Sequence, residues 1–138
     1  MNSMSKVKSE AIVKKCFDAL NRKDVDGFIA LFSQEVSGHW NGFTGDRKLI
    51  HYHYSKWFEA FPDAEADVKR IFSAGDWVAA EFTWEVTHTG TWPGLPQIAA
   101  TGKRAKIEAA LIAEVKADKI GYLGIYWNIK KLERDLLG

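Results

Sequence analysis

Two polar residues stand at the ends of predicted strands in the second half of the chain and could take part in proton transfer. His88 closes an alternating apolar row that begins at Val78, and an unperturbed imidazole titrates near neutrality, as a general base requires. Asn128 follows the last predicted strand, and its amide can donate a hydrogen bond to a developing oxyanion. Each has a structural alternative: His88 as a buried histidine bonded to a loop carbonyl, and Asn128 as the N-cap of a last helix.

Two more histidines could assist His88. His53 falls on the inward stripe of a predicted helix with Tyr54 and Trp57, whereas His51 points elsewhere. A hydrogen-bonded core histidine is the alternative for His53. His39 belongs to a segment beside the expected pocket mouth.

The stretch from Arg104 to Asn128 predicts a hairpin, because every second residue from Ala105 to Val115 is apolar and Ala117-Asp118 suits a turn. A two-residue loop would pair Val115 with Ile120, Ala113 with Tyr122, Ala109 with Tyr126 and Ile107 with Asn128. This register places Tyr122, Tyr126 and Asn128 over small residues, as the floor of a pocket. The tyrosines could instead be core residues with bonded hydroxyls.

The other face of the same hairpin is predicted to be apolar, and its residues are Ala110, Ile112, Leu123, Ile125 and Trp127. An apolar outer sheet face usually marks a partner surface, so we expect a homodimer through it.

Large aromatic residues are expected around the pocket. Trp40, Trp57 and Trp84 occupy inward positions, and Trp92 belongs to a predicted mouth loop over residues 89–102. A small core also needs large apolar side chains, so these residues indicate only that any ligand is hydrophobic.

The elements that must position these side chains are three helices followed by antiparallel strands. Helices are predicted from about Ser5 to Asn21, over an apolar repeat from Val25 to Phe32, and from Asp46 to Phe61; Asp24 and Asp46 are the expected N-caps. Alternating segments then predict strands, and a short helix ends the chain. This order predicts an α+β fold, with the helices on one face of a strongly curved sheet.

Composition narrows the function further. The 138 residues fit one domain, and a net charge of +1 without basic clusters argues against nucleic acid. The single Cys16 excludes an internal disulfide and a thiolate metal site. No apolar run reaches membrane length, and the polar stretch 1–8 lacks a signal-peptide core, so a cytoplasmic location is expected.

Several short motifs follow one another along the chain: Phe61-Pro62-Asp63, Gly75-Asp76-Trp77-Val78, Thr87-His88-Thr89-Gly90, Thr101-Gly102-Lys103, Lys119-Ile120 and Leu136-Leu137-Gly138. Together they resemble the SnoaL-like polyketide cyclase family of the nuclear transport factor 2-like superfamily. His39, ahead of Asn41-Gly42, also matches a histidine common in the family. The resemblance implies a cone-shaped α+β barrel with an aromatic-lined pocket for a hydrophobic small molecule, without metal or organic cofactor.

The resemblance also implies a catalytic position and a departure from it. In family cyclases an aspartate near the end of the last strand serves as acid and base in an aldol ring closure. The matching residue is Asn128, which has no titratable proton near neutral pH. The usual proline before Thr-Gly-Lys is Ala100 here.

These observations lead to two hypotheses and a remaining alternative. The first is an enzyme that moves a proton next to a carbonyl in aldol cyclisation, isomerisation or dehydration. His88 would be its base, His39 or His53 would assist, and Asn128 with a tyrosine would stabilise the oxyanion. The second is a non-catalytic ligand-binding or carrier module. A structural dimer with an incidental cavity is the remaining alternative.

Overall fold

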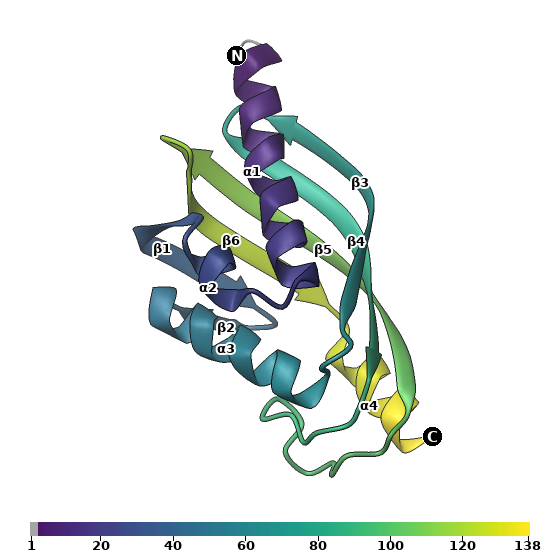
Figure 1. Ribbon diagram of the computed structural model, residues 1–138. Helices are drawn as coiled ribbons and strands as arrows, with labels where there is room; N and C mark the ends of the chain where they lie inside the picture. Colours follow the sequence, from purple (N-terminus) through teal and green to yellow (C-terminus); the bar gives the residue numbers. More distant parts are fainter. Residues whose placement is uncertain (1–2) are drawn as a thin grey trace.

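The computed structural model describes residues 3–138, with side chains from Lys8 onward; residues 1 and 2 of the polar N-terminal stretch lie outside it. The elements are α1 (Ser3–Asn21), α2 (Val25–Ile29), β1 (Phe32–Trp40), β2 (Phe43–Gly45), α3 (Arg47–Ala60), β3 (Glu65–Ala74), β4 (Trp77–Thr87), β5 (Arg104–Lys116), β6 (Lys119–Trp127) and α4 (Ile129–Leu137) (Figure 1).

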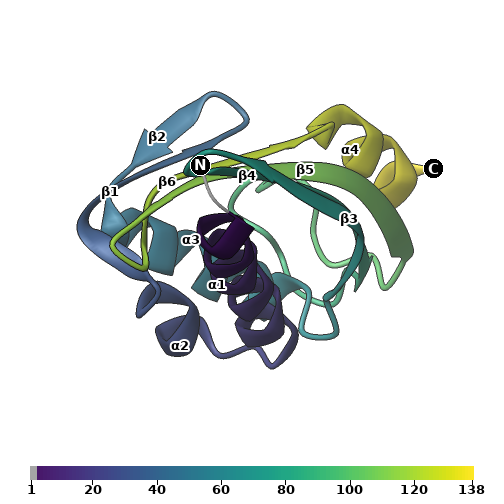
Figure 2. The same ribbon diagram turned by 90° about the horizontal axis from the view of Figure 1, so that it is seen from above.

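One curved sheet carries the fold. Its strand order is β2-β1-β6-β5-β4-β3, with β1 parallel to β6 and the other neighbours antiparallel. The sheet bends around α1, α2 and α3, which lie on its concave side (Figure 2), and α4 packs near the start of β5. The predicted α+β architecture, with three N-terminal helices inside a mainly antiparallel sheet, is therefore confirmed.

The helix boundaries follow from local capping. Asp24 accepts a hydrogen bond from the Gly27 amide over 2.9 Å, and Asp46 accepts one from the Leu49 amide over 3.0 Å. Both predicted N-caps are confirmed. The second helix is shorter than its apolar repeat indicated, because it ends at Ile29 and Phe32 begins β1. Burial of Phe32 in the sheet overrides the helical spacing.

The hairpin of β5 and β6 forms, but most of its predicted register is wrong. Ala117 and Asp118 have φ of 51° and 62°, as a tight two-residue hairpin turn requires. Val115 pairs with Ile120 as predicted, whereas Glu114 already pairs with Tyr122, so Gly121 is an extra residue in β6. Such a bulge reverses which face each later residue occupies.

The reversal exchanges the two faces of β6. Leu123 and Ile125 are buried on the concave side, and Trp127 pairs with the inward-facing Ala109. The prediction that these three residues form an outer patch is wrong. Tyr122 and Tyr126 take the outer face instead, opposite Glu114 and Ala110.

The concave side of the sheet holds the hydrophobic core. Val13, Cys16 and Leu20 of α1 are buried against the sheet, with Phe17 in contact with Phe82 of β4. Within residues 3–138 no helix is long and apolar enough to cross a membrane.

Candidate functional site

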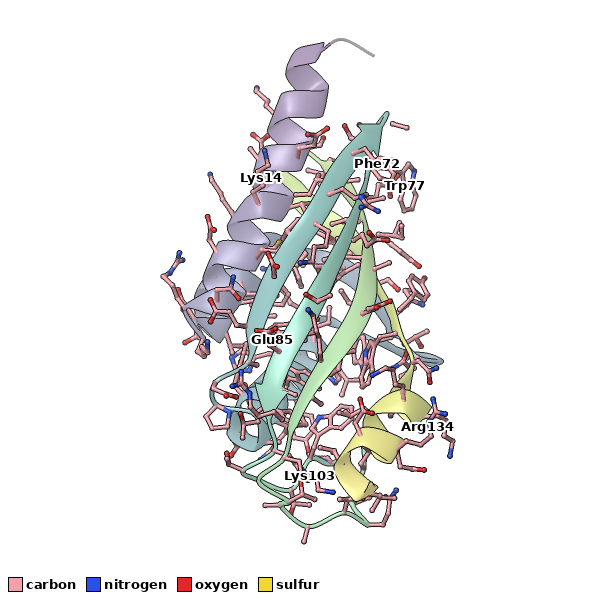
Figure 3. All side chains as sticks on the ribbon, turned by 90° about the vertical axis from the view of Figure 1, so that its right-hand side faces the viewer. Lys14, Phe72, Trp77, Glu85, Lys103 and Arg134 are labelled. Atoms are coloured by element: carbon pink, nitrogen blue, oxygen red, sulfur yellow. The ribbon has the colours of Figure 1, made fainter. Side chains whose placement is uncertain are left out.

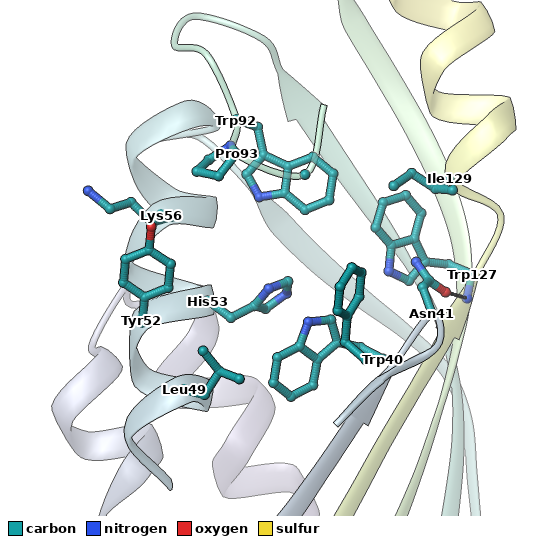
Figure 4. Close-up of a pocket in the computed structure, with 12 residues that line it drawn as sticks. Trp40, Asn41, Leu49, Tyr52, His53, Lys56, Trp92, Pro93, Trp127 and Ile129 are labelled. Atoms are coloured by element: carbon teal, nitrogen blue, oxygen red, sulfur yellow. Dashed lines mark hydrogen bonds between the residues drawn. The ribbon is translucent and has the colours of Figure 1, made fainter. Parts of the chain in front are cut away.

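A hollow opens at one end of the cone between α3, the β1–β2 turn, the loop after β4 and the end of β6 (Figure 4). Its volume is about 270 Å³. Its apolar lining consists of Trp40, Phe43, Leu49, Trp92, Pro93, Gly94, Trp127 and Ile129, and its polar lining of Asn41, Tyr52, His53 and Lys56. Apolar walls with a few polar groups are typical of small-molecule sites.

His53 is the titratable group within the aromatic part of this pocket. It points from α3 toward Trp40, and their ring centroids are 4.7 Å apart (Figure 4). Burial lowers the pKa of His53 from 6.5 to about 4, because a charged imidazole loses its hydration among these rings. His53 is therefore neutral at physiological pH, and its inward orientation is confirmed.

Tryptophans from four elements surround the inner end of the pocket. Trp92 comes from the predicted mouth loop, and its ring centroid lies 5.8 Å from that of Trp127 and 5.3 Å from that of Trp57. Trp40 and Trp92 line the pocket as predicted. Trp57 and Trp84 were also expected around the pocket, but neither lines it. Trp57 lies behind the lining residues, and Trp84 lies deeper in the core, with its ring centroid 5.7 Å from that of Trp57.

Asn41 fixes the opposite wall. It has φ of 48°, a left-handed conformation that asparagine tolerates better than most residues. Its side-chain amide is oriented so that both the nitrogen and the oxygen are hydrogen-bonded. The nitrogen donates to the Trp127 carbonyl over 2.9 Å, and the oxygen accepts from the Trp127 indole N–H over 3.2 Å. Asn41 thus holds Trp127 in the pocket wall.

Lys56 and Tyr52 form the outer rim. The Lys56 ammonium lies 5.7 Å from the centre of the Tyr52 ring and 3.0 Å from a Glu59 carboxylate oxygen. Both hydrogen-bond donors are next to solvent, at the entrance to the apolar space. Within residues 3–138 no group of histidine, cysteine or acidic side chains is arranged to hold a metal ion.

His88 lies at the base of the loop that follows β4. It is fully buried, and its Nδ1 lies 3.2 Å from the Thr101 amide nitrogen and 3.1 Å from the Thr101 hydroxyl. Burial also lowers the pKa of His88. His88 is not among the residues that line the pocket, so the expectation that it faces the ligand space is wrong.

Asn128 is the N-cap of α4. It is exposed, and its side-chain oxygen accepts a hydrogen bond from the Lys131 amide over 3.1 Å. The capping alternative is confirmed. Asn128 lies outside the aromatic pocket, and the predicted convergence of Asn128, Tyr126 and His88 does not occur.

His39, Tyr122 and Tyr126 gather on the convex face of the sheet. His39 stacks on Tyr122 with a centroid distance of 4.8 Å and lies 2.8 Å from the Ser37 hydroxyl, measured from its Nε2. The two tyrosine hydroxyls are 2.9 Å apart, and Tyr126 is 47% exposed. The expectation that these residues share the pocket is wrong. The bulge at Gly121 turns both tyrosines outward, and His39 alternates on β1 with Gly38 and Trp40, which are buried on the concave side.

Sequence reasoning missed Trp127 and Asn41 as pocket residues. The glycine at 121 was the signal for a bulge that could have placed Trp127 correctly. Asn41 lies in the turn between β1 and β2, and its contact with Trp127, 86 residues further along the chain, has no local signal in the sequence.

The fold and the pocket define an α+β cone of the nuclear transport factor 2-like class, and comparison with known proteins agrees. AclR, a candidate hydroxylase of Streptomyces galilaeus, is 23% identical, with a TM-score of 0.86 over 95% of this chain and 96% of that one. A protein from a Jannaschia species assigned as a SnoaL-like polyketide cyclase is 12% identical, with a TM-score of 0.88 over 99% and 96%. An LEH-like epoxide hydrolase of M. tuberculosis is 17% identical, with a TM-score of 0.73 over 96% and 91%.

These identities are low, so the likeness shows the fold. A comparison with curated proteins gives no match. The profile of the SnoaL-like polyketide cyclase family matches residues 10–136. The chain therefore belongs to the SnoaL-like polyketide cyclase family, as its motifs indicated.

Proposed function

We propose that the pocket binds a hydrophobic small molecule and that the protein moves a proton next to a carbonyl of that molecule without a cofactor. The observation that carries the proposal is His53, a neutral imidazole held by burial inside an aromatic pocket. A neutral imidazole can accept a proton, and exclusion of water strengthens its interaction with the reacting group. His53 thus takes the role of base that the sequence favoured for His88.

The chemistry follows from the positions of the polar groups. His53 would take the proton from a carbon next to a carbonyl, and the electron pair left on that carbon would form an enolate. Tyr52 and Lys56 are the rim donors available to the enolate oxygen. The protonated His53 would return the proton to carbon or oxygen in an isomerisation, an aldol closure or a dehydration.

The low pKa of His53 limits the substrate. A base with a pKa of about 4 is weak, so it removes protons efficiently only where the carbanion is strongly stabilised. A carbon between two carbonyls meets this condition. The volume of about 270 Å³ fits a compact ring system, with further parts of a larger molecule extending past the rim.

Deuterium incorporation into an aryl β-keto ester, ethyl benzoylacetate, tests the proposal. The carbon between its two carbonyls should exchange faster with wild-type protein than in buffer, and His53→Phe should remove the acceleration. His51→Phe is the matched control, because His51 lies on the same helix but bonds to Asp26 outside the pocket. Equal acceleration by wild type and His53→Phe would refute His53 as the base.

A non-catalytic binding or carrier module is the second candidate. It is favoured by the pocket lining, in which no described residue carries a carboxylate, and by Asn128, which serves as a cap at the position where the family resemblance implies an aspartate. The same experiment separates the two functions. Saturable binding of the keto ester without any exchange above buffer would favour the binding module.

We also propose a homodimer through the convex sheet face, with residues that differ from those expected. Phe72, Trp77 and Tyr126 are 59%, 43% and 47% exposed there, and Phe72 and Trp77 point away from α1 (Figure 3). The nearby Arg70–Glu81 and Lys116–Glu114 pairs carry both signs of charge, so two copies related by a twofold axis can place acid against base. A monomer by light scattering at micromolar concentration would contradict this proposal.

A further inference from the structure

The loop between β4 and β5 is closed at its base by one residue, His88. The His88 amide donates to the Lys103 carbonyl over 2.9 Å, and the His88 carbonyl accepts from the Gly102 amide over 2.7 Å. The imidazole adds the contacts from its Nδ1 to the amide and hydroxyl of Thr101. Main chain and side chain of His88 therefore hold both ends of the loop together.

The contacts of His88 determine which of its two ring nitrogens carries the proton. A backbone N–H can only donate, so Nδ1 of His88 must accept from Thr101 and carry no proton. In the neutral ring the proton is then on Nε2, which is buried without a hydrogen-bond partner among the described residues. Neither nitrogen offers a free lone pair, so His88 is unsuited to remove a proton from a ligand.

The loop carries part of the pocket wall. Trp92, Pro93 and Gly94 line the pocket, and a Cβ on Gly94 would lie 2.4 Å from the Trp92 ring. The amides of Thr89 and Gly90 donate to the Ala60 carbonyl at the end of α3, over 3.1 and 3.0 Å. The start of the loop is therefore tied to the helix that carries His53, whereas its return to β5 depends on the contacts of His88.

We propose that His88 is a positioning residue, whose Nδ1 holds the end of the loop and thereby keeps Trp92 in place as a wall of the pocket. This inference rests on the proposed function, because it assigns His88 to the shape of the binding pocket. It separates two histidines that the sequence could not distinguish: His53 faces the ligand space, and His88 fixes the loop that closes it.

Two variants at position 88 test the inference. His88→Asn keeps an acceptor close to the position of Nδ1, whereas His88→Leu fills similar space without an acceptor. We expect His88→Leu to shift the indole N–H resonance of Trp92, to increase hydrogen exchange at the Thr101 amide and to weaken binding of 8-anilinonaphthalene-1-sulfonate by about tenfold. His88→Asn should restore all three readouts toward wild type. An effect of general packing loss would appear equally in both variants.

The outcomes distinguish this inference from the proposed function. An unmoved Trp92 resonance in a folded His88→Leu protein would overturn the inference, and so would equal effects of His88→Leu and His88→Asn. If His88→Leu does not fold, Thr101→Val removes the hydroxyl that bonds His88 and Lys103, and the same readouts apply. Absence of probe binding to the wild type would count against the proposed function, and the Trp92 resonance would then decide the positioning role.

Discussion

Replacing His53 by phenylalanine should make the protein less sensitive to acid. The pKa of His53 is lowered from 6.5 to about 4 by burial, so the unfolded chain binds a proton at His53 that the folded chain refuses. The stability that comes from keeping His53 neutral is fully present above about pH 6.5 and is lost as the pH falls toward 4. Phenylalanine has a similar shape, fits among the neighbouring rings and has no proton to bind.

The magnitude follows from the width of this window. It spans about 2.5 pH units at about 1.4 kcal/mol each, so the full loss approaches about 3 kcal/mol. Between about pH 7 and about pH 5, where few carboxylates titrate, His53 should lower the free energy of unfolding by about 2 kcal/mol. Burial lowers the pKa of His88 too, so His88 also reduces the free energy of unfolding as the pH falls. This reduction is the same in wild type and His53→Phe, and it cancels in the comparison.

Urea denaturation at the two pH values measures the difference. The wild type should lose about 2 kcal/mol more than His53→Phe between about pH 7 and about pH 5. His51→Gln, on the exposed side of α3, should retain the wild-type loss. Identical pH dependence in wild type and His53→Phe would refute the conclusion that His53 is held neutral by the pocket.

Three other predictions concern positions outside the pocket. Asn128→Ala should lower the free energy of unfolding by about 1 kcal/mol through loss of the cap. Asn128→Asp should keep the stability and should not speed deuterium exchange of the keto ester. Faster exchange with Asn128→Asp would contradict the position of Asn128 outside the pocket. Tyr126→Lys should shift a dimer to monomer in light scattering, and an unchanged mass of the dimer would exclude this face. Cys16 is buried with a raised pKa, so Ellman's reagent should modify it only in denaturant, and rapid modification of the native protein would contradict its burial.

Local signals predicted the fold well. Apolar spacing identified α1 and α3, Asp24 and Asp46 marked the starts of α2 and α3, and strict alternation identified β4 and β5. The Ala117-Asp118 turn was also readable from strand length and spacing. These features depend on residues close together in the sequence, which is why a single chain reveals them.

The site was harder to predict because it depends on one bulge. The extra residue at Gly121 moves Trp127 into the pocket and turns Tyr122 and Tyr126 outward. A periodic pattern on β6 is compatible with either face, and only packing against β1 and β5 decides between them. The histidines posed the same difficulty: His53 and His88 both lie on inward rows, and hydrogen bonds to Thr101 separate their roles.

The most direct test of the pocket is an indole N–H spectrum of the protein titrated with ethyl benzoylacetate. Trp40, Trp92 and Trp127 line the pocket, whereas Trp77 lies on the convex face and serves as an internal control. We predict that the three pocket resonances shift together and saturate while that of Trp77 stays fixed. Shifts at Trp77 with unmoved pocket resonances would contradict the assignment of this cavity as the functional site.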